Sequence, residues 1–312
     1  MTAGLVGACL ALTVPAPAAT LAYVTEQGAD SVAVVDIDSW RIVAQVKVGG
    51  KPAGVAVAPG GQRIFVSNPG SATVSAIEAG GHVVAEVPAG QGPLGVATDR
   101  DGKLVFVADW YNDAVHVLDA ETLKELRVLH VGRSPSGMTV SPDNQRLYVA
   151  NRESDTLSVV DLTSWDTVAT IPVGKAPFGV TWDDNGPRLW VANVQSSDVS
   201  VVDPLTLKEI RRLKVRDFPY AVAVTRDGAR AFVTNQHDDS VSVIDGKTYE
   251  QLAVLKVGDY PEGVLIAPDQ RHALVSCWMD DELVSIDVAT LKIDRMLPLL
   301  SGPRAFGQFI AP

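Results

Sequence analysis

The sequence predicts an all-β protein in which seven small four-stranded antiparallel sheets close into a ring. Three observations carry this prediction. Every repeat holds four short apolar runs bounded by turn residues, which is typical of strands. A pair formed by an aromatic residue or leucine and then valine recurs seven times. A proline-led tripeptide also recurs at almost constant spacing, with its prolines at Pro52, Pro93, Pro135, Pro177, Pro219, Pro261 and Pro303. Such regular repeats of short strands predict a seven-bladed β-propeller.

The fourth repeat shows the expected order of strands, which we letter A to D. Its apolar runs predict strand A at 137–140, strand B at 146–151, strand C at 156–161 and strand D at 167–171. The turn between A and B carries residues that favour tight hairpins. Its copies are Gly60-Gly61, Asp101-Gly102, Pro142-Asp143, Asn185-Gly186, Asp227-Gly228 and Pro268-Asp269.

The turn between C and D opens with aspartate, and serine or threonine follows three residues later. An aspartate in this place most often accepts hydrogen bonds from its own turn, so we interpret these carboxylates as structural. They are Asp36, Asp119, Asp161, Asp203, Asp245 and Asp287.

The two ends of the chain are expected to form one blade together. Residues 20–48 supply strands B, C and D of a blade but no strand A. The last proline-led unit supplies that strand at 304–310, so the ring is expected to close by pairing the chain ends, with both ends ordered.

Positions 1–19 are expected to form a signal peptide without its basic start, followed by a single propeller domain at 20–312. The apolar run from Leu5 to Val14 is too short to span a bilayer, and the small residues up to Ala19 suit signal peptidase. The protein is therefore expected to be periplasmic or secreted, a monomer, and without a membrane span. Removal of the leader takes Cys9 away and leaves Cys277 unpaired.

A formal net charge of −11 limits the partners. An acidic surface disfavours duplex nucleic acid and anionic lipid, because both require positive charge on the protein.

Three strand segments resemble the YVTN-repeat β-propeller family: Tyr148-Val149-Ala150-Asn151, Phe232-Val233-Thr234-Asn235 and Val241-Ser242-Val243-Ile244-Asp245. The closing segment 302–307 is similar to that of exported propellers associated with pyrroloquinoline-quinone-dependent catabolism. This resemblance implies a non-enzymatic protein whose partner is a periplasmic quinoprotein dehydrogenase or a c-type cytochrome.

The face that holds the D–A and B–C connections is the expected binding face, because the opposite face consists of repeated turns. If strand A is innermost, as the resemblance implies, the residue after each proline lies at the mouth of the central channel. Four of these seven positions are large or charged: Phe178, Tyr220, Glu262 and Arg304. Glu262 and Arg304 come from adjacent blades, so they are expected either to form a salt bridge at the rim, which contributes little if it is exposed, or to leave Arg304 to bind an anionic group.

The B–C loops add further candidates for binding a ligand or partner. They are Trp110, Tyr111, Arg152, His237 and Trp278. Large aromatic residues on loops indicate a binding surface, although they can also fold back over their own blades.

No cofactor is expected from the sequence, and no catalytic or metal residue is assigned. The five histidines fall at different places in their repeats, which argues against a histidine metal cluster. One recurring position carries Glu26, Asn68, Asp109, Asn151, Asn193 and Asn235. Their side-chain oxygens are suitable calcium ligands, so a calcium site stays an open alternative. The recurrence of such residues in nearly every repeat favours a role in the turn. Cys277 takes the same position in the last repeat and is interpreted as a buried small residue.

The function favoured by the sequence is a non-catalytic exported propeller that binds a protein partner or a small ligand, as an accessory to a periplasmic quinoprotein oxidation or transport system. Whether the protein is an enzyme stays open. The first alternative is a lactonase-like hydrolase that uses Glu262, Arg304 and His237 or a calcium ion. The second is single-stranded nucleic-acid binding through loop aromatics and Arg152, which the negative charge disfavours.

Overall fold

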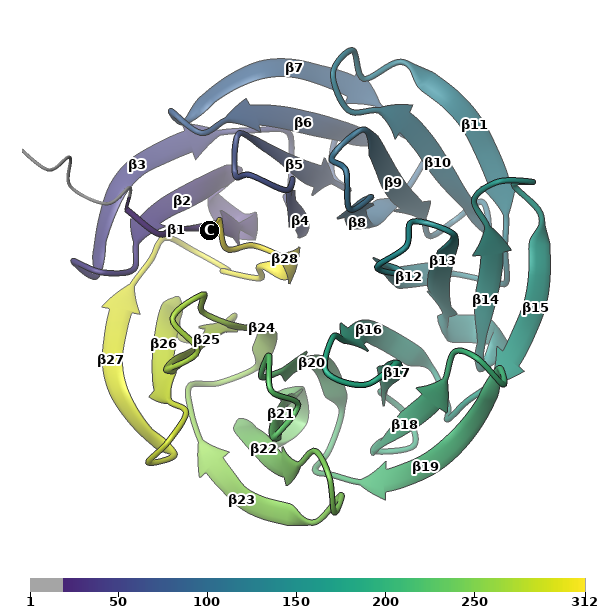
Figure 1. Cartoon of the computed structure of the whole chain (residues 1–312). Coiled ribbons are helices and arrows are strands. Elements are labelled where there is room, and N and C mark those ends of the chain that lie inside the picture. Colours follow the sequence, from purple (N-terminus) through teal and green to yellow (C-terminus); the bar gives the residue numbers. More distant parts are fainter. Residues whose placement is uncertain (1–18, 312) are drawn as a thin grey trace, which may run out of the picture.

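The computed structural model describes residues 19–311, so the expected signal peptide and Cys9 lie outside the described residues except for Ala19. Seven sheets follow one another in a ring, in chain order (Figure 1). The all-β, seven-bladed fold predicted from the repeats is confirmed. The fourth blade matches its predicted strands to within two residues at every boundary.

The first four blades have the following strands. Blade 1 is β1 (Leu21–Glu26), β2 (Ser31–Asp36) and β3 (Arg41–Lys47). Blade 2 is β4 (Gly54–Val57), β5 (Arg63–Asn68), β6 (Thr73–Glu78) and β7 (His82–Pro88). Blade 3 is β8 (Pro93–Thr98), β9 (Leu104–Asp109), β10 (Ala114–Asp119) and β11 (Glu125–His130). Blade 4 is β12 (Pro135–Val140), β13 (Arg146–Asn151), β14 (Thr156–Asp161) and β15 (Thr167–Pro172).

The remaining strands complete the ring. Blade 5 is β16 (Pro177–Asp183), β17 (Arg188–Asn193), β18 (Asp198–Asp203) and β19 (Lys208–Lys214). Blade 6 is β20 (Pro219–Val224), β21 (Arg230–Asn235), β22 (Ser240–Asp245) and β23 (Gln251–Lys256). Blade 7 is β24 (Pro261–Ile266), β25 (His272–Cys277), β26 (Glu282–Asp287) and β27 (Lys292–Pro298). The last strand is β28 (Phe306–Gln308), and three 3-10 turns are η1 (Gln27–Ala29), η2 (Arg152–Ser154) and η3 (Gln236–Asp238).

The hydrophobic core lies between neighbouring blades. Phe65 of blade 2 is fully buried against Val96 and Val107 of blade 3, and the other interfaces repeat this arrangement with their own strand B residues. The aromatic–valine pair therefore recurs because each blade must bury one apolar face against the next.

The glycine of the proline-led unit is required by the approach of adjacent inner strands. A Cβ atom added at Gly95 would lie 1.9 Å from the Ser136 carbonyl oxygen of blade 4, and one at Gly54 would lie 2.3 Å from the Leu94 carbonyl oxygen. A side-chain hydroxyl also joins blades 2 and 3, since Ser67 Oγ on β5 donates to the Leu94 carbonyl on β8 at 2.5 Å. Inner strands this close leave no room for a side chain at that position.

The C-terminal segment lies on the inner side of blade 1 and contacts blades 2 and 7 as well. Tyr23 N donates to Phe309 O at 2.7 Å, and Arg304 N donates to Thr25 O at 3.0 Å. These bonds are the ones that an inner strand of blade 1 would make. The segment is not a regular strand over 304–310, however. Only two isolated bridges join it to β1, and β28 pairs in parallel with β4. It therefore remains a prediction that closure of the ring depends on this segment.

The repeated polar positions act in turns as the sequence predicted. Asp36 Oδ1 accepts the backbone N–H of Asp38 at 2.9 Å and of Ser39 at 3.1 Å, and each other C–D aspartate accepts a backbone N–H of its own turn. At the position for which calcium was left open, Asn68 Nδ2 donates to the hydroxyls of Thr73 and Ser75. The described asparagines at this position therefore use their side-chain amides to hold their own B–C loops.

Candidate functional site

The D–A and B–C loops of each blade meet on one face of the ring. Trp110 N donates to Gly92 O at 2.9 Å in blade 3, and Trp278 N donates to Tyr260 O at 3.0 Å in blade 7. Because a B–C loop is bonded to the D–A loop before it, the two predicted groups of site residues share one surface.

Arg304 and Glu262 form a buried ion pair at the channel mouth. Arg304 Nε donates to Glu262 Oε2 at 2.5 Å, and Arg304 Nη2 donates to Oε1 at 3.0 Å and to Tyr220 Oη at 2.7 Å. Gln236 Nε2 also donates to Glu262 Oε1, at 2.7 Å. The predicted pairing is present, and the pair is buried rather than exposed at the rim. Glu262 is completely buried, and the Arg304 side chain is 18% exposed.

The electrostatics of this pair follow from its burial. Burial disfavours the Arg304 cation, but the Glu262 carboxylate and the Tyr220 hydroxyl outweigh it and raise the pKa of Arg304. Burial raises the pKa of Glu262 above its usual range, and the Arg304 guanidinium opposes that rise. Burial likewise raises the pKa of Tyr220, which leaves its hydroxyl protonated at neutral pH. Arg304 therefore remains a cation with one carboxylate already bound.

Aromatic rings pack against one another beneath the mouth. Phe178 lies 4.1 Å from Tyr220, 4.8 Å from Phe306 and 6.3 Å from Trp110, measured between ring centroids. Above them is a pocket of about 250 Å³. Its lining is Pro69, Gly92, Leu94, Trp110, Tyr111, Phe178, Tyr220 and Arg304. Five predicted site residues thus share one pocket, although Trp110 belongs to blade 3 and Arg304 to the segment after blade 7.

A second cation lies beside this pocket. The Arg152 guanidinium carbon is 5.5 Å from the centre of the Trp110 ring, and Arg152 Nη1 donates to Glu153 Oε1 at 2.8 Å. Tyr111 is 71% exposed, so it has not folded back over its blade. The mouth of the channel therefore combines flat apolar surfaces with positive charge, in a protein that is acidic overall.

The remaining predicted residues form an arc of rings that leads away from the pocket. The Arg304 guanidinium carbon lies 5.7 Å from the Trp278 ring, which lies 6.0 Å from Tyr260. His237 is 5.4 Å from Tyr260 and stacks on Phe218 at 3.9 Å. Trp278 and His237 therefore lie on the predicted face but outside the pocket lining.

Four contributors to this surface were not among the predicted site residues: Phe218, Gln236, Tyr260 and Phe306. Phe218 and Tyr260 immediately precede the repeat prolines, so the residue before each proline was a usable signal. Nothing in the sequence around Gln236 distinguishes it from a surface residue.

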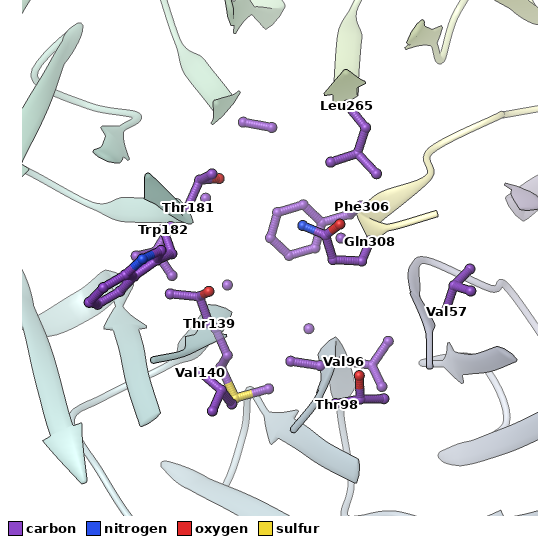
Figure 2. Close-up of a pocket in the computed structure, with 18 of the residues that line it drawn as sticks. Val57, Val96, Thr98, Thr139, Val140, Thr181, Trp182, Leu265, Phe306 and Gln308 are labelled. Carbon is purple, nitrogen blue, oxygen red and sulfur yellow. The ribbon is translucent and has the colours of Figure 1, made fainter. Parts of the chain in front are cut away.

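A second cavity of about 300 Å³ lies at the other end of the channel (Figure 2). Thr139, Thr181 and Leu265 project into it from different inner strands, and Phe306 and Gln308 of the C-terminal segment also line it. Phe306 lines this cavity and also contacts the rings beneath the mouth, so it lies between the two ends of the channel.

Among residues 19–311, no group of three or more histidine, cysteine, aspartate or glutamate side chains is arranged to hold a metal ion. Cys277 is fully buried, and burial raises the pKa of its thiol to about 12. No helix in the described part of the chain is long and apolar enough to cross a membrane.

Comparisons with known proteins give two family matches. The cytochrome D1 haem domain matches residues 17–136, and the seven-bladed β-propeller lactonase family matches residues 121–204. Neither match reaches half of the chain. No curated protein matches it. The first match overturns the expectation that the protein takes no cofactor, because the family it describes is a haem domain.

Three solved structures resemble the chain over 93% of its length. Dihydro-haem d1 dehydrogenase NirN in complex with DHE has a TM-score of 0.72 and 21% identity, with 75% of that chain covered. Kuenenia stuttgartiensis hydrazine synthase has a TM-score of 0.79 and 18% identity over 100% of that chain. A functionally unknown protein from Desulfotomaculum acetoxidans has a TM-score of 0.79 and 16% identity over 98% of that chain. At these identities the likeness shows the fold alone, and the chain is a seven-bladed β-propeller.

Proposed function

We propose that this protein binds a flat, anionic, haem-type ligand at the channel mouth, on the face of the D–A and B–C loops. The observation that carries the proposal is the pocket in which Trp110, Tyr111 and Phe178 lie beside the cations Arg304 and Arg152. Aromatic side chains stack on a conjugated macrocycle, and guanidinium groups bind carboxylates. The haem-domain match and the structural likeness to NirN support this ligand class.

The residues fit such a group in their chemistry. Trp110, Tyr111 and Phe178 would hold the ring system. Arg152 would bind an acidic substituent, since its one close acidic partner among the described residues, Glu153, is 51% exposed. Arg304 is already bound to Glu262 and would contribute through its positive field. His237 would be a candidate iron ligand at the edge of this site, because its exposed ring lies on the same face, outside the pocket lining. When bound, a haem-type group would supply redox chemistry that the protein side chains lack.

The broader role follows from the same site. A propeller that binds or transfers a haem-type ligand would act together with redox proteins. It would be an accessory protein whose own residues do not catalyse a reaction. Export to the periplasm, membership of the YVTN-repeat family, the association with quinoprotein oxidation and a cytochrome partner belong to this proposal as sequence-based expectations.

The test is a titration of the purified protein with haemin and with metal-free protoporphyrin IX, followed by Soret absorbance and tryptophan fluorescence. We expect both ligands to bind in a one-to-one ratio. Arg152→Gln should weaken both about tenfold, the effect of losing roughly 1.4 kcal/mol of charge-assisted contact.

Arg127→Gln is the matched control, because Arg127 lies over Trp165 at 5.2 Å in a similar cation–π pair built from a different tryptophan. Equal effects of the two variants, or no binding of either ligand, would contradict the proposal. Weaker binding of haemin alone in His237→Ala would assign His237 as a ligand to the iron.

The lactonase match motivates a second candidate, hydrolysis of a lactone at the same mouth. Glu262 adjoins the pocket through Arg304 and Tyr220, but its carboxylate is bound by Arg304 and Gln236. Lactone turnover that disappears in Glu262→Gln while the fold is retained would favour this candidate over the binding protein.

A further inference from the structure

Blade 3 departs from a polar pair that four other blades share. In blades 2, 4, 5 and 6, an asparagine at the end of strand B donates from Nδ2 to a serine seven residues later. These pairs are Asn68 with Ser75, Asn151 with Ser158, Asn193 with Ser200, and Asn235 with Ser242. Blade 3 has Asp109 and His116 in these two places, so titratable groups replace neutral ones.

Asp109 holds the loops that form one wall of the mouth pocket. It is completely buried. Its Oδ1 accepts the backbone N–H of Gly92 at 2.9 Å and of Tyr111 at 3.3 Å. Its Oδ2 accepts the Gln91 N–H at 3.0 Å and Asn112 Nδ2 at 2.6 Å. Gly92 and Tyr111 both line the pocket, so this one carboxylate fixes the D–A loop and the B–C loop relative to each other.

His116 joins Asp109 to a second carboxylate. Its Nδ1 lies 2.6 Å from Glu125 Oε2 on β11, and its Nε2 lies 3.4 Å from Asp109 Oδ2 on β9. Within residues 19–311, these two carboxylates are the charged groups that contact the imidazole. Arg127, also on β11, lies over Trp165 instead.

A neutral imidazole has one N–H and cannot donate to both carboxylates. The shorter contact places that proton on Nδ1, toward Glu125, so the Nε2 lone pair then faces the Asp109 carboxylate. Protonated His116 donates to both carboxylates at once and turns an unfavourable contact into a charge-assisted hydrogen bond. Asp109 gains a firm partner in that state.

We propose that Asp109 is the positioning residue of the mouth pocket. When His116 is protonated, it holds the Asp109 carboxylate, and with it the two loops, more firmly, so that ligand binding strengthens as the pH falls from 8 to 5.5. This inference rests on the proposed function for its ligand and on the blade 3 geometry for its mechanism. The gain is expected to be about fivefold, as for one added hydrogen bond.

The experiment exchanges the pair for the one that the other blades use. Asp109→Asn together with His116→Ser gives blade 3 the asparagine–serine pair, and the double variant is expected to fold. His272→Ser is the matched control, since His272 also lies between two carboxylates, Asp269 and Asp294, at 2.6 and 3.3 Å. Binding of a sulfonated porphyrin, whose sulfonates stay ionised over this range, is measured across the pH series.

Wild type and His272→Ser should bind more tightly at low pH, and the blade 3 double variant should show little pH dependence. An unchanged pH dependence in the double variant would overturn the inference. A measurement without ligand tests this inference independently of the proposed function. The Trp110 indole N–H resonance should follow the titration of the His116 ring resonances in wild type, and a Trp110 signal that ignores His116 would overturn the inference even if no porphyrin binds.

Discussion

Arg304 and Glu262 join the last segment of the chain to blade 7 through two hydrogen bonds within one buried ion pair. The backbone of Arg304 is also bonded on both sides, by Arg304 N to Thr25 O in blade 1 and by Ser276 Oγ to Arg304 O in blade 7. The residue that presents positive charge to the mouth pocket therefore also lies where the ring closes.

Removal of the Glu262 carboxylate is expected to destabilise the protein strongly. Glu262→Ala leaves the Arg304 cation largely buried without its counter-ion, a change that typically costs about 3–5 kcal/mol. Glu209→Ala is the matched control, because Arg212 also contacts Glu209 through two hydrogen bonds but in a partly exposed pair, which should cost about 1 kcal/mol or less. Urea unfolding measures both, and equal losses would contradict the burial argument.

Deletion of 303–312 is expected to abolish cooperative unfolding. The truncation removes the backbone partners of Tyr23 and Thr25 and exposes the inner edge of blade 1. Circular dichroism during thermal unfolding measures the effect. A 303–312 truncate that melts like the full-length protein would show that the ring does not need this segment.

Gly95→Ala is expected to cost more than about 2 kcal/mol, because the new Cβ would lie 1.9 Å from the Ser136 carbonyl oxygen and force adjacent blades apart. Gly186→Ala is the control, since its Cβ would meet nothing closer than the Arg188 side chain at 3.6 Å. Chemical denaturation compares the two variants. A Gly95→Ala protein as stable as Gly186→Ala would mean that the inner strands can separate without cost.

Acid is expected to lower stability as the pH falls below about 4. The backbone N–H of Thr122 is the leading cause that lowers the pKa of Asp119, and hydrogen bonds likewise lower the pKa of the other five C–D aspartates. A carboxyl whose pKa is lower in the folded state stabilises the fold above its unfolded pKa of about 3.9, and this contribution disappears as the pH falls through the folded value.

Melting temperatures measured from pH 7 to 2.5 check this expectation. Asp119→Asn should melt lower than wild type at pH 7 and lose less on acidification, whereas the exposed Asp38→Asn should follow wild type. A wild-type melting temperature that does not fall between pH 4 and 2.5 would contradict the role of the turn carboxylates.

Most of the fold was accessible from the sequence because each blade repeats one local pattern. Strand B needs an apolar face, the A–B and C–D turns need hairpin and capping residues, and the unit then recurs at almost constant spacing. The closing segment was harder to describe. Its position depends on both chain ends, so the parallel pairing of β28 with β4 was not foreseen.

The sequence by itself determined the seven blades and the face on which Phe178, Tyr220, Glu262 and Arg304 lie, because a fixed repeat puts equivalent positions at equivalent places. Only the tertiary structure decided that Glu262 is fully buried, that Gln236 binds it, and that Trp110 shares a pocket with Arg304. These contacts cross the ring between blades, where the direction and packing of each side chain, which differ from one repeat to the next, determine the partners.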